Sequence, residues 1–168
     1  MAISAEDVKK LREQTGAGML DSKNALEKAK GDIDKAKAIL NEAGFAAATK
    51  RADRETAEGL VQSYIHHNQR VGALVEVNCE TDFVARTDDF KELVAAIALQ
   101  IGGTQPKYVS IEELPADSDE DPKEVVLLEQ PYLRDESKTV ADLVREAISR
   151  TGENIRIKRF ARFELGAK

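Results

Sequence analysis

The chain has 168 residues, of which 42% are hydrophobic and 33% charged, and its formal net charge is −6 at pH 7. This composition is ordinary for a folded globular protein, and the length allows one domain or a small domain beside a larger one. The acidic balance argues against general nucleic-acid binding, which requires a basic surface. The single cysteine, Cys79, excludes an internal disulfide framework and fits a reducing compartment.

The sequence contains no sign of export or of membrane insertion. The first residues, M-A-I-S-A-E-D, form neither an apolar signal core nor an arginine-rich presequence. No apolar run approaches the roughly 20 residues that are needed to span a bilayer. We therefore expect a cytoplasmic protein with no membrane partner, the alternative being a protein whose transit peptide was removed before residue 1.

Residues 1–50 are predicted to form a small domain of three short helices. Ser4 is a plausible N-cap of the first helix, and the glycines at 16 and 18 separate it from a second helix over Met19–Ala29. Asp32 caps a third helix, whose apolar residues recur at helical spacing up to Gly44, a residue type that often ends a helix. The segment Phe45–Glu58 is rich in alanine and charge, and we interpret it as a helical connector.

Residues 51–168 are predicted to form an α+β domain with a small antiparallel sheet covered by helices. Strands are expected at Gly59–His66 and Val71–Asn78, joined by a turn, and a third near the C-terminus. The first covering helix carries one continuous apolar stripe: Phe90, Leu93, Val94, Ile97, Ala98 and Ile101. The second follows Thr139, which with Asp142 is typical of a capping box, and it ends at Gly152.

The last strand carries an interrupted alternating pattern. Its expected apolar face consists of Ile155, Ile157, Ala161, Phe163 and Leu165, and Arg159 is the one misfit, which a β-bulge would accommodate. The basic side chains Arg156, Lys158 and Arg162 are expected together on the other face. Exposure to solvent explains these basic residues as well as a partner surface does.

The stretch V-E-V-N-C-E-T-D-F-V-A-R (Val75–Arg86) is the most informative part of the sequence. An alternating apolar strand ends there, and the next helical pattern begins only near Asp88, so Phe83 is expected in the connection between them. A phenylalanine at such a place either packs back into the core or is offered to a partner. For an arbitrary sequence the core interpretation is favoured, since an isolated apolar residue needs no special explanation.

Four segments in order resemble the elongation factor Ts family of translation. N-C-E-T-D-F-V-A-R (Asn78–Arg86) is similar to its signature, and Val8–Leu26 resembles its small N-terminal domain, a helical bundle of the ubiquitin-associated type. Tyr64–Val77 resembles its first hairpin, and the segments L-L-E-Q-P-Y (Leu127–Tyr132) and Gly152–Gly166 resemble its end. The resemblance covers nearly the whole chain, although longer members have two related core halves and this chain has one.

The resemblance implies a guanine nucleotide-exchange factor that binds elongation factor Tu in its GDP-bound and nucleotide-free forms. It assigns the disturbance of the partner's magnesium and phosphate site to Thr81, Asp82, Phe83 and Val84, with docking by residues 1–50. Three strands leave one apolar face of the sheet that a second copy could cover, so we expect a homodimer formed through the sheet of residues 51–168. The loop Asp117–Pro122 is shorter than the family's usual helical insertion, which puts the contacts of that insertion in doubt.

We expect no enzymatic reaction, no cofactor and no nucleotide site in this chain, since it has neither phosphate-binding glycine motif after a strand. His66 and His67 are neighbours on an expected strand and would point to opposite faces, so they do not form a metal site. Two other hypotheses remain open. One is a ubiquitin-associated-like peptide adaptor, which explains residues 1–44; the other is an acid–base enzyme using Glu80, Asp82 and His66.

Overall fold

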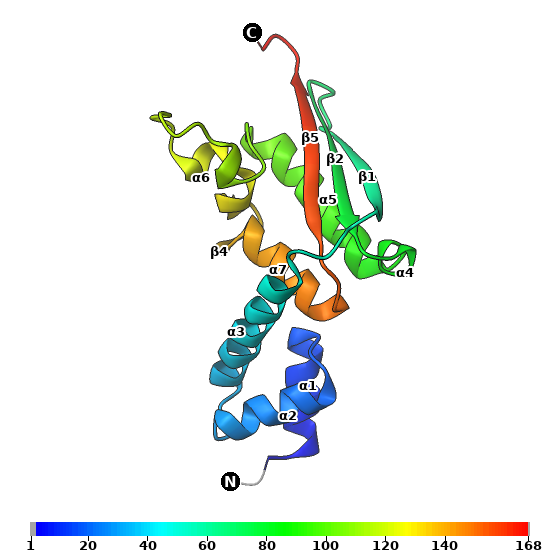
Figure 1. Cartoon of the computed structure of the whole chain (residues 1–168), viewed down its shortest axis with the longest axis vertical. Coiled ribbons are helices and arrows are strands. Elements are labelled where there is room, and N and C mark those ends of the chain that lie inside the picture. The colour runs from blue at the N-terminus through cyan, green and yellow to red at the C-terminus, as the bar shows by residue number, and fades with distance from the viewer. Residues whose placement is uncertain (1–2, 168) are drawn as a thin grey trace.

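A computed structural model describes residues 3–167 and shows a small helical bundle joined to a larger α+β part by one long helix (Figure 1). The bundle consists of α1 (Ala5–Thr15), α2 (Met19–Lys28) and α3 (Ile33–Arg51). The larger part contains an antiparallel sheet of β1 (Glu58–Ile65), β2 (Val71–Cys79) and β5 (Arg156–Glu164), with β2 in the middle. The predicted α+β fold, with its N-terminal three-helix bundle, is confirmed.

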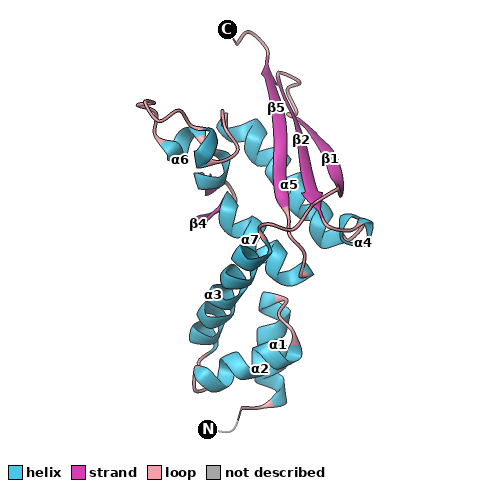
Figure 2. Ribbon diagram, viewed as in Figure 1, coloured by secondary structure: helices cyan, strands magenta, loops and turns pink. Residues whose placement is uncertain are grey.

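Helices and short turns lie behind and beside this sheet (Figure 2). The helices are α4 (Asp82–Ala85), α5 (Asp88–Thr104), α6 (Pro122–Val125) and α7 (Val140–Thr151). Two 3₁₀ turns lie at Ile111–Glu113 and Leu127–Glu129, and a small second sheet pairs β3 (Pro131–Tyr132) with β4 (Asp135–Thr139). None of the helices described is long and apolar enough to cross a membrane.

The core of the larger part lies between the sheet and α5, with α7 packed against α5. All six residues of the predicted apolar stripe on α5 are buried, and they meet Val75 and Val77 of the central strand. The bundle has a separate, smaller core around Val8, Leu11 and Leu26. Each part therefore has a core of its own, and among the buried bundle residues described only Ala48, near the end of α3, belongs to the core of the other part.

The predicted helix caps are confirmed. Ser4 and Asp7 form a capping box at α1, and Thr139 and Asp142 form one at α7. The side chain of Asp32 accepts the Lys35 N–H at the start of α3. These local hydrogen bonds satisfy backbone N–H groups that have no partner within the helix.

Helix α3 does not end at Gly44, so that prediction is wrong. It continues to Arg51 because its second half packs along α7, where a Cβ atom on Gly44 would lie 2.6 Å from the Ser149 Oγ. Glycine is needed here for the close approach of two helices and not as a helix end. One turn further on, Ala48 joins the core of the larger part. The domain division at residue 50 falls inside α3, and the existence of two separable domains stays a prediction.

The predicted bulge in the last strand is confirmed, but its consequence differs from our expectation. Glu76 pairs with Arg159 and Val77 with Ile157, so Lys158 is the extra residue. The bulge reverses the alternation and turns Phe160 and Arg162 towards the helices. The Arg162 guanidinium donates to the Gly102 carbonyl at 3.3 Å, and therefore does not share a face with Arg156.

The same reversal leaves an apolar patch on the other face of the sheet. Ala161 and Phe163 pair with residues of β2 that point away from α5, and the Phe163 side chain is 76% exposed. We call this patch the open sheet face; its large apolar residues are Val61, Ile65, Leu74 and Phe163. In Figure 1 the three strands lie in front of α5, and nothing else in residues 3–167 covers this face.

Candidate functional site

The Thr81–Val84 segment forms a single exposed turn between the central strand and α5. It includes the start of the four-residue helix α4, which the sequence pattern did not predict. The Thr81 side chain accepts the Val84 N–H at 3.4 Å and so caps this turn. Phe83 is 81% exposed, the largest exposed fraction among the large hydrophobic residues described. Of the two interpretations of Phe83, packing in the core is excluded.

The inner side of this turn is held by packing. Ala85 is buried, and Val84 is half-buried against the core. Asp82 forms an ion pair with Arg86 at 2.8 Å on the exposed side. A surface pair of this kind adds little stability, so Asp82 can exchange its partner at small cost.

The amino end of the turn is held by Glu153, which follows α7. Its Oε2 accepts the backbone N–H groups of Glu80 and Thr81 at 3.1 and 3.0 Å, and its Oε1 accepts the Thr81 hydroxyl at 2.6 Å. In return, the Glu80 carboxylate accepts the Asn154 N–H at 2.6 Å. These reciprocal carboxylate contacts join the start of the turn to the segment that follows α7.

Asn154 ties a third segment to the same place. Its buried side-chain amide donates to the carbonyls of Ala52 at 3.2 Å and Arg54 at 2.8 Å, just after α3. The Arg54 guanidinium also reaches the Glu80 carboxylate at 3.4 Å. The end of α3, the start of the exposed turn and the start of β5 therefore meet at one point.

Cys79 is a buried structural thiol beside this turn. Burial, and secondly the nearby Glu153 carboxylate, raise the pKa of Cys79 to about 11. The thiol therefore stays protonated at neutral pH, and it donates to the Thr81 carbonyl at 3.2 Å. A nucleophilic role would require the thiolate.

The structure does not bring together the residues of the acid–base hypothesis. Glu80 follows β2 and His66 precedes it, so the nine residues of that strand separate them by roughly 25–30 Å. The prediction that His66 and His67 point to opposite faces is wrong, because β1 ends at Ile65 and their rings lie 4.2 Å apart in the turn. No three His, Cys, Asp or Glu side chains within residues 3–167 are arranged to hold a metal ion.

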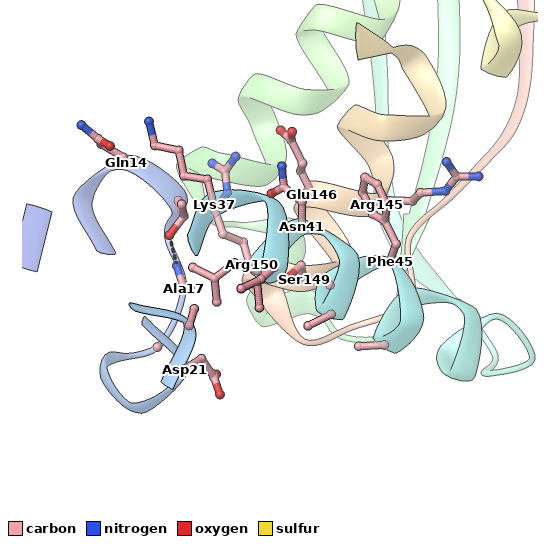
Figure 3. Close-up of a pocket in the computed structure, with 18 of the residues that line it drawn as sticks. Gln14, Ala17, Asp21, Lys37, Asn41, Phe45, Arg145, Glu146, Ser149 and Arg150 are labelled. Carbon is pink, nitrogen blue, oxygen red and sulfur yellow. Dashed lines mark hydrogen bonds between the residues drawn. The ribbon is translucent and has the colours of Figure 1, made fainter. Parts of the chain in front are cut away.

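A cleft of about 710 Å³ is lined by residues of α1, α2, α3 and α7 (Figure 3). Phe45 packs there beneath the Arg145 guanidinium, 5.4 Å from the ring centre. Two acidic side chains line the cleft, Asp21 and Glu146, together with six basic ones: Lys28, Lys37, Arg51, Lys138, Arg145 and Arg150. Three of these cations are already paired with carboxylates: Lys37 with Asp34, Lys138 with Glu146 and Arg145 with Asp142. We therefore take the exposed turn, with its outward-facing Phe83, as the better candidate site.

Comparisons with known proteins agree with the resemblance carried by the sequence motifs. The family model described as elongation factor TS matches residues 5–123. The elongation factor Ts of Coprothermobacter proteolyticus is 48% identical, and the match covers 99% of this chain and all of that protein. The elongation factor Ts of Caldanaerobacter subterraneus is 50% identical, with 98% of this chain and 97% of that protein covered.

The relatives are also longer within the matched region. The alignment with the Coprothermobacter protein extends over 196 positions, although this chain has 168 residues. The elongation factor Ts of Fervidobacterium nodosum, 46% identical over 196 positions, gives the same picture with 99% of this chain and all of that protein covered. This chain therefore lacks residues that these two relatives carry.

Proposed function

Because the chain belongs to the elongation factor Ts family, we propose that it is a guanine nucleotide-exchange factor for elongation factor Tu. In this proposal it binds the GDP-bound form, promotes release of GDP, and leaves the nucleotide-free form ready for GTP. Binding reciprocity requires that a factor which weakens nucleotide binding is itself bound less tightly when nucleotide is present. The chain then needs no nucleotide site, cofactor or chemical step of its own.

The observation that carries this proposal is the exposed Phe83 on a turn whose ends are fixed. A side chain held away from its own core is available to enter an apolar gap of a partner, and burying one phenylalanine contributes roughly 1.5–3 kcal/mol. Phe83 serves as the wedge that opens the partner's magnesium and phosphate site. Asp82 exchanges its pair with Arg86 for donors of the partner, while Thr81 and Val84 hold the turn.

One exposed turn does not supply enough contact area for a stable complex, so other surfaces must dock. The bundle supports this role, since Met19 and Leu20 at the start of α2 are both more than half exposed. We propose that residues 1–50 dock on elongation factor Tu while the turn acts on the nucleotide site. In this proposal the chain acts on elongation factor Tu during translation elongation in the cytoplasm, and it does not contact nucleic acid directly. The peptide-adaptor alternative explains the bundle alone and leaves the exposed turn without a role.

The decisive experiment is GDP release from purified elongation factor Tu. We expect catalytic amounts of this chain to accelerate the loss of a fluorescent GDP analogue in the presence of excess GTP or GDP. The acceleration should saturate with factor concentration, because a complex forms before GDP leaves. Release at the unassisted rate, with the chain folded and the partner active, would exclude the exchange function and leave the adaptor alternative.

We also propose that the chain forms a homodimer through the open sheet face. Four large apolar side chains are exposed together there, and a second copy can cover them in a two-layer packing of sheets. The patch is continuous across the three strands, since Ile65, Gly72 and Phe163 are aligned in register.

Light scattering over a dilution series tests the dimer. The unaltered chain is expected to have the mass of a dimer at tens of micromolar, and Phe163→Asp is expected to shift it to a monomer without unfolding it. Leu133→Asp is the matched control, because Leu133 is 48% exposed outside the open sheet face. A monomeric mass for the unaltered, folded chain would contradict the proposal.

A further inference from the structure

We infer that Glu153 is a positioning residue for nucleotide exchange, one that sets the orientation of Phe83 through the amino end of the exposed turn. This inference rests on the proposed function of the turn and adds a residue that lies outside the Thr81–Val84 segment. Glu153 is 70 residues further along the chain than Phe83, and it acts from the connection between α7 and β5.

The Phe83 side chain makes few contacts that could fix its own direction. It is 81% exposed, so packing within the free protein does not orient it. The helix that carries it has only four residues, fewer than an isolated helix needs for stability. The direction of the side chain therefore depends on the packing of Val84 and Ala85 and on how the two ends of the turn are attached.

The carboxyl end is attached to α5. The Thr87 hydroxyl donates to the Val84 carbonyl at 2.7 Å and accepts the Phe90 N–H at 3.3 Å, at the start of that helix. Since Phe90 is fully buried, this end is fixed to the core. If the amino end of the turn were displaced, the turn would therefore rotate about its fixed carboxyl end.

The amino end is attached through Glu153. Its carboxylate accepts three hydrogen bonds from Glu80 and Thr81, and bonds to a charged acceptor are stronger than neutral ones. The Gly152 backbone, at a φ of 75°, ends α7 and turns the chain so that Glu153 faces the exposed turn. The return bond from the Asn154 N–H to Glu80 fixes the two segments to each other.

The Glu153 carboxylate stabilises the turn that carries Phe83 in two ways. It satisfies the Glu80 and Thr81 N–H groups, which lie between the end of β2 and the first turn of α4. It also occupies the Thr81 hydroxyl hydrogen, which leaves the hydroxyl oxygen free to accept the Val84 N–H. Loss of Glu153 therefore loosens both the entry into the turn and its cap, while Phe83 itself is unchanged.

The test compares Glu153→Ala with Glu153→Gln, which keeps one oxygen acceptor, and with Glu136→Ala as the control. Glu136 is an exposed carboxylate on β4, on the side of the molecule away from α4 in Figure 1. In the free protein, Glu153→Ala is expected to lower the hydrogen-exchange protection of the Glu80 and Thr81 amides by about tenfold or more. The glutamine variant should retain part of this protection, and the control should retain all of it.

Exchange kinetics separate positioning from general stability. With elongation factor Tu, Glu153→Ala should lower the limiting rate of GDP release by about tenfold, since small misplacements of an acting group have large effects. The half-saturating concentration should change less than about twofold, because the docking surfaces are intact. In a Phe83→Ala background the same change should alter the rate by less than about twofold, since residues that act through one another are not additive.

If Glu153→Ala does not fold, Thr81→Val takes its place, with Thr81→Ser as the control that keeps the hydroxyl. Unchanged protection of the Glu80 and Thr81 amides in Glu153→Ala would overturn the inference. It would also be overturned if Glu153→Ala slowed GDP release by the same factor in the unaltered chain and in the Phe83→Ala variant. If Glu153→Ala released GDP at the normal rate while Phe83→Ala released it slowly, the inference would be refuted and the proposed function would stand. If Phe83→Ala itself exchanges normally, the proposed role of the turn fails and the inference fails with it.

Discussion

Replacing Phe83 by alanine is expected to slow GDP release from elongation factor Tu by about tenfold or more, with little change in the melting temperature of the free chain. The side chain is 81% exposed, so the free protein loses almost no buried contact. The complex loses the contact that opposes nucleotide, and burial of one phenylalanine corresponds to a factor of about ten or more in an equilibrium. Exchange should fall further than complex affinity does, because the docking surfaces remain.

Two measurements on the same sample decide this prediction: thermal melting, and fluorescent GDP release at several factor concentrations. Leu133→Ala is a matched control, since it removes another exposed apolar side chain far from the turn in sequence. Asp82→Ala should act in the same direction as Phe83→Ala and more weakly. A large drop in melting temperature with normal exchange per folded molecule would mean that Phe83 stabilises the core and is not a wedge.

Local patterns predicted the elements of the fold well. The capping residues Ser4, Asp32 and Thr139 each start a helix, because the side chain and the N–H it accepts lie only three residues apart. The apolar stripe of α5 was equally readable, since its spacing reflects one buried helix face. Such features depend on neighbours in sequence, and a sequence contains those directly.

The errors lie where a distant segment decides the local structure. Gly44 reads as a helix end, but Ser149 of α7 comes so close that only glycine fits inside a continuing helix. The bulge at Lys158 was foreseen from the misfit at Arg159, yet nothing local indicated that Phe160 would turn inwards. The α3–α7 contact and the register with β2 are tertiary features.

The candidate site shows the same division. The Thr81–Val84 motif was recognisable by resemblance, whereas its exposure required the structure to choose between two interpretations of Phe83. Glu153 carried no signal in the sequence, because its hydrogen bonds join segments 72 and 73 residues apart. A carboxylate directly after a glycine that ends a helix is too common a pattern to indicate a partner.

Phe90 provides the opposite case to Phe83, and Phe90→Ala is expected to lower the free energy of unfolding by about 3–5 kcal/mol. It lies seven residues further along the chain and is fully buried between α5 and the sheet. Alanine there leaves a cavity that the surrounding strands cannot fill without distortion. For a chain of this length the loss corresponds to a fall in melting temperature of about 6–20 °C.

The contrast between the two phenylalanines separates a structural role from a functional one. Phe90→Ala should exchange nucleotide at nearly the normal rate per folded molecule, provided that the assay temperature lies well below its melting transition. Its backbone N–H also fixes the carboxyl end of the exposed turn through Thr87, and alanine keeps that N–H. Urea denaturation followed by circular dichroism gives the loss of stability, and GDP release at 20 °C gives the rate.

If Phe90→Ala melted normally, the described packing of α5 against the sheet would be contradicted. If it were stable at 20 °C but slow in exchange, the core beneath the turn would take part in orienting Phe83, and the wedge would depend on more than its two attached ends.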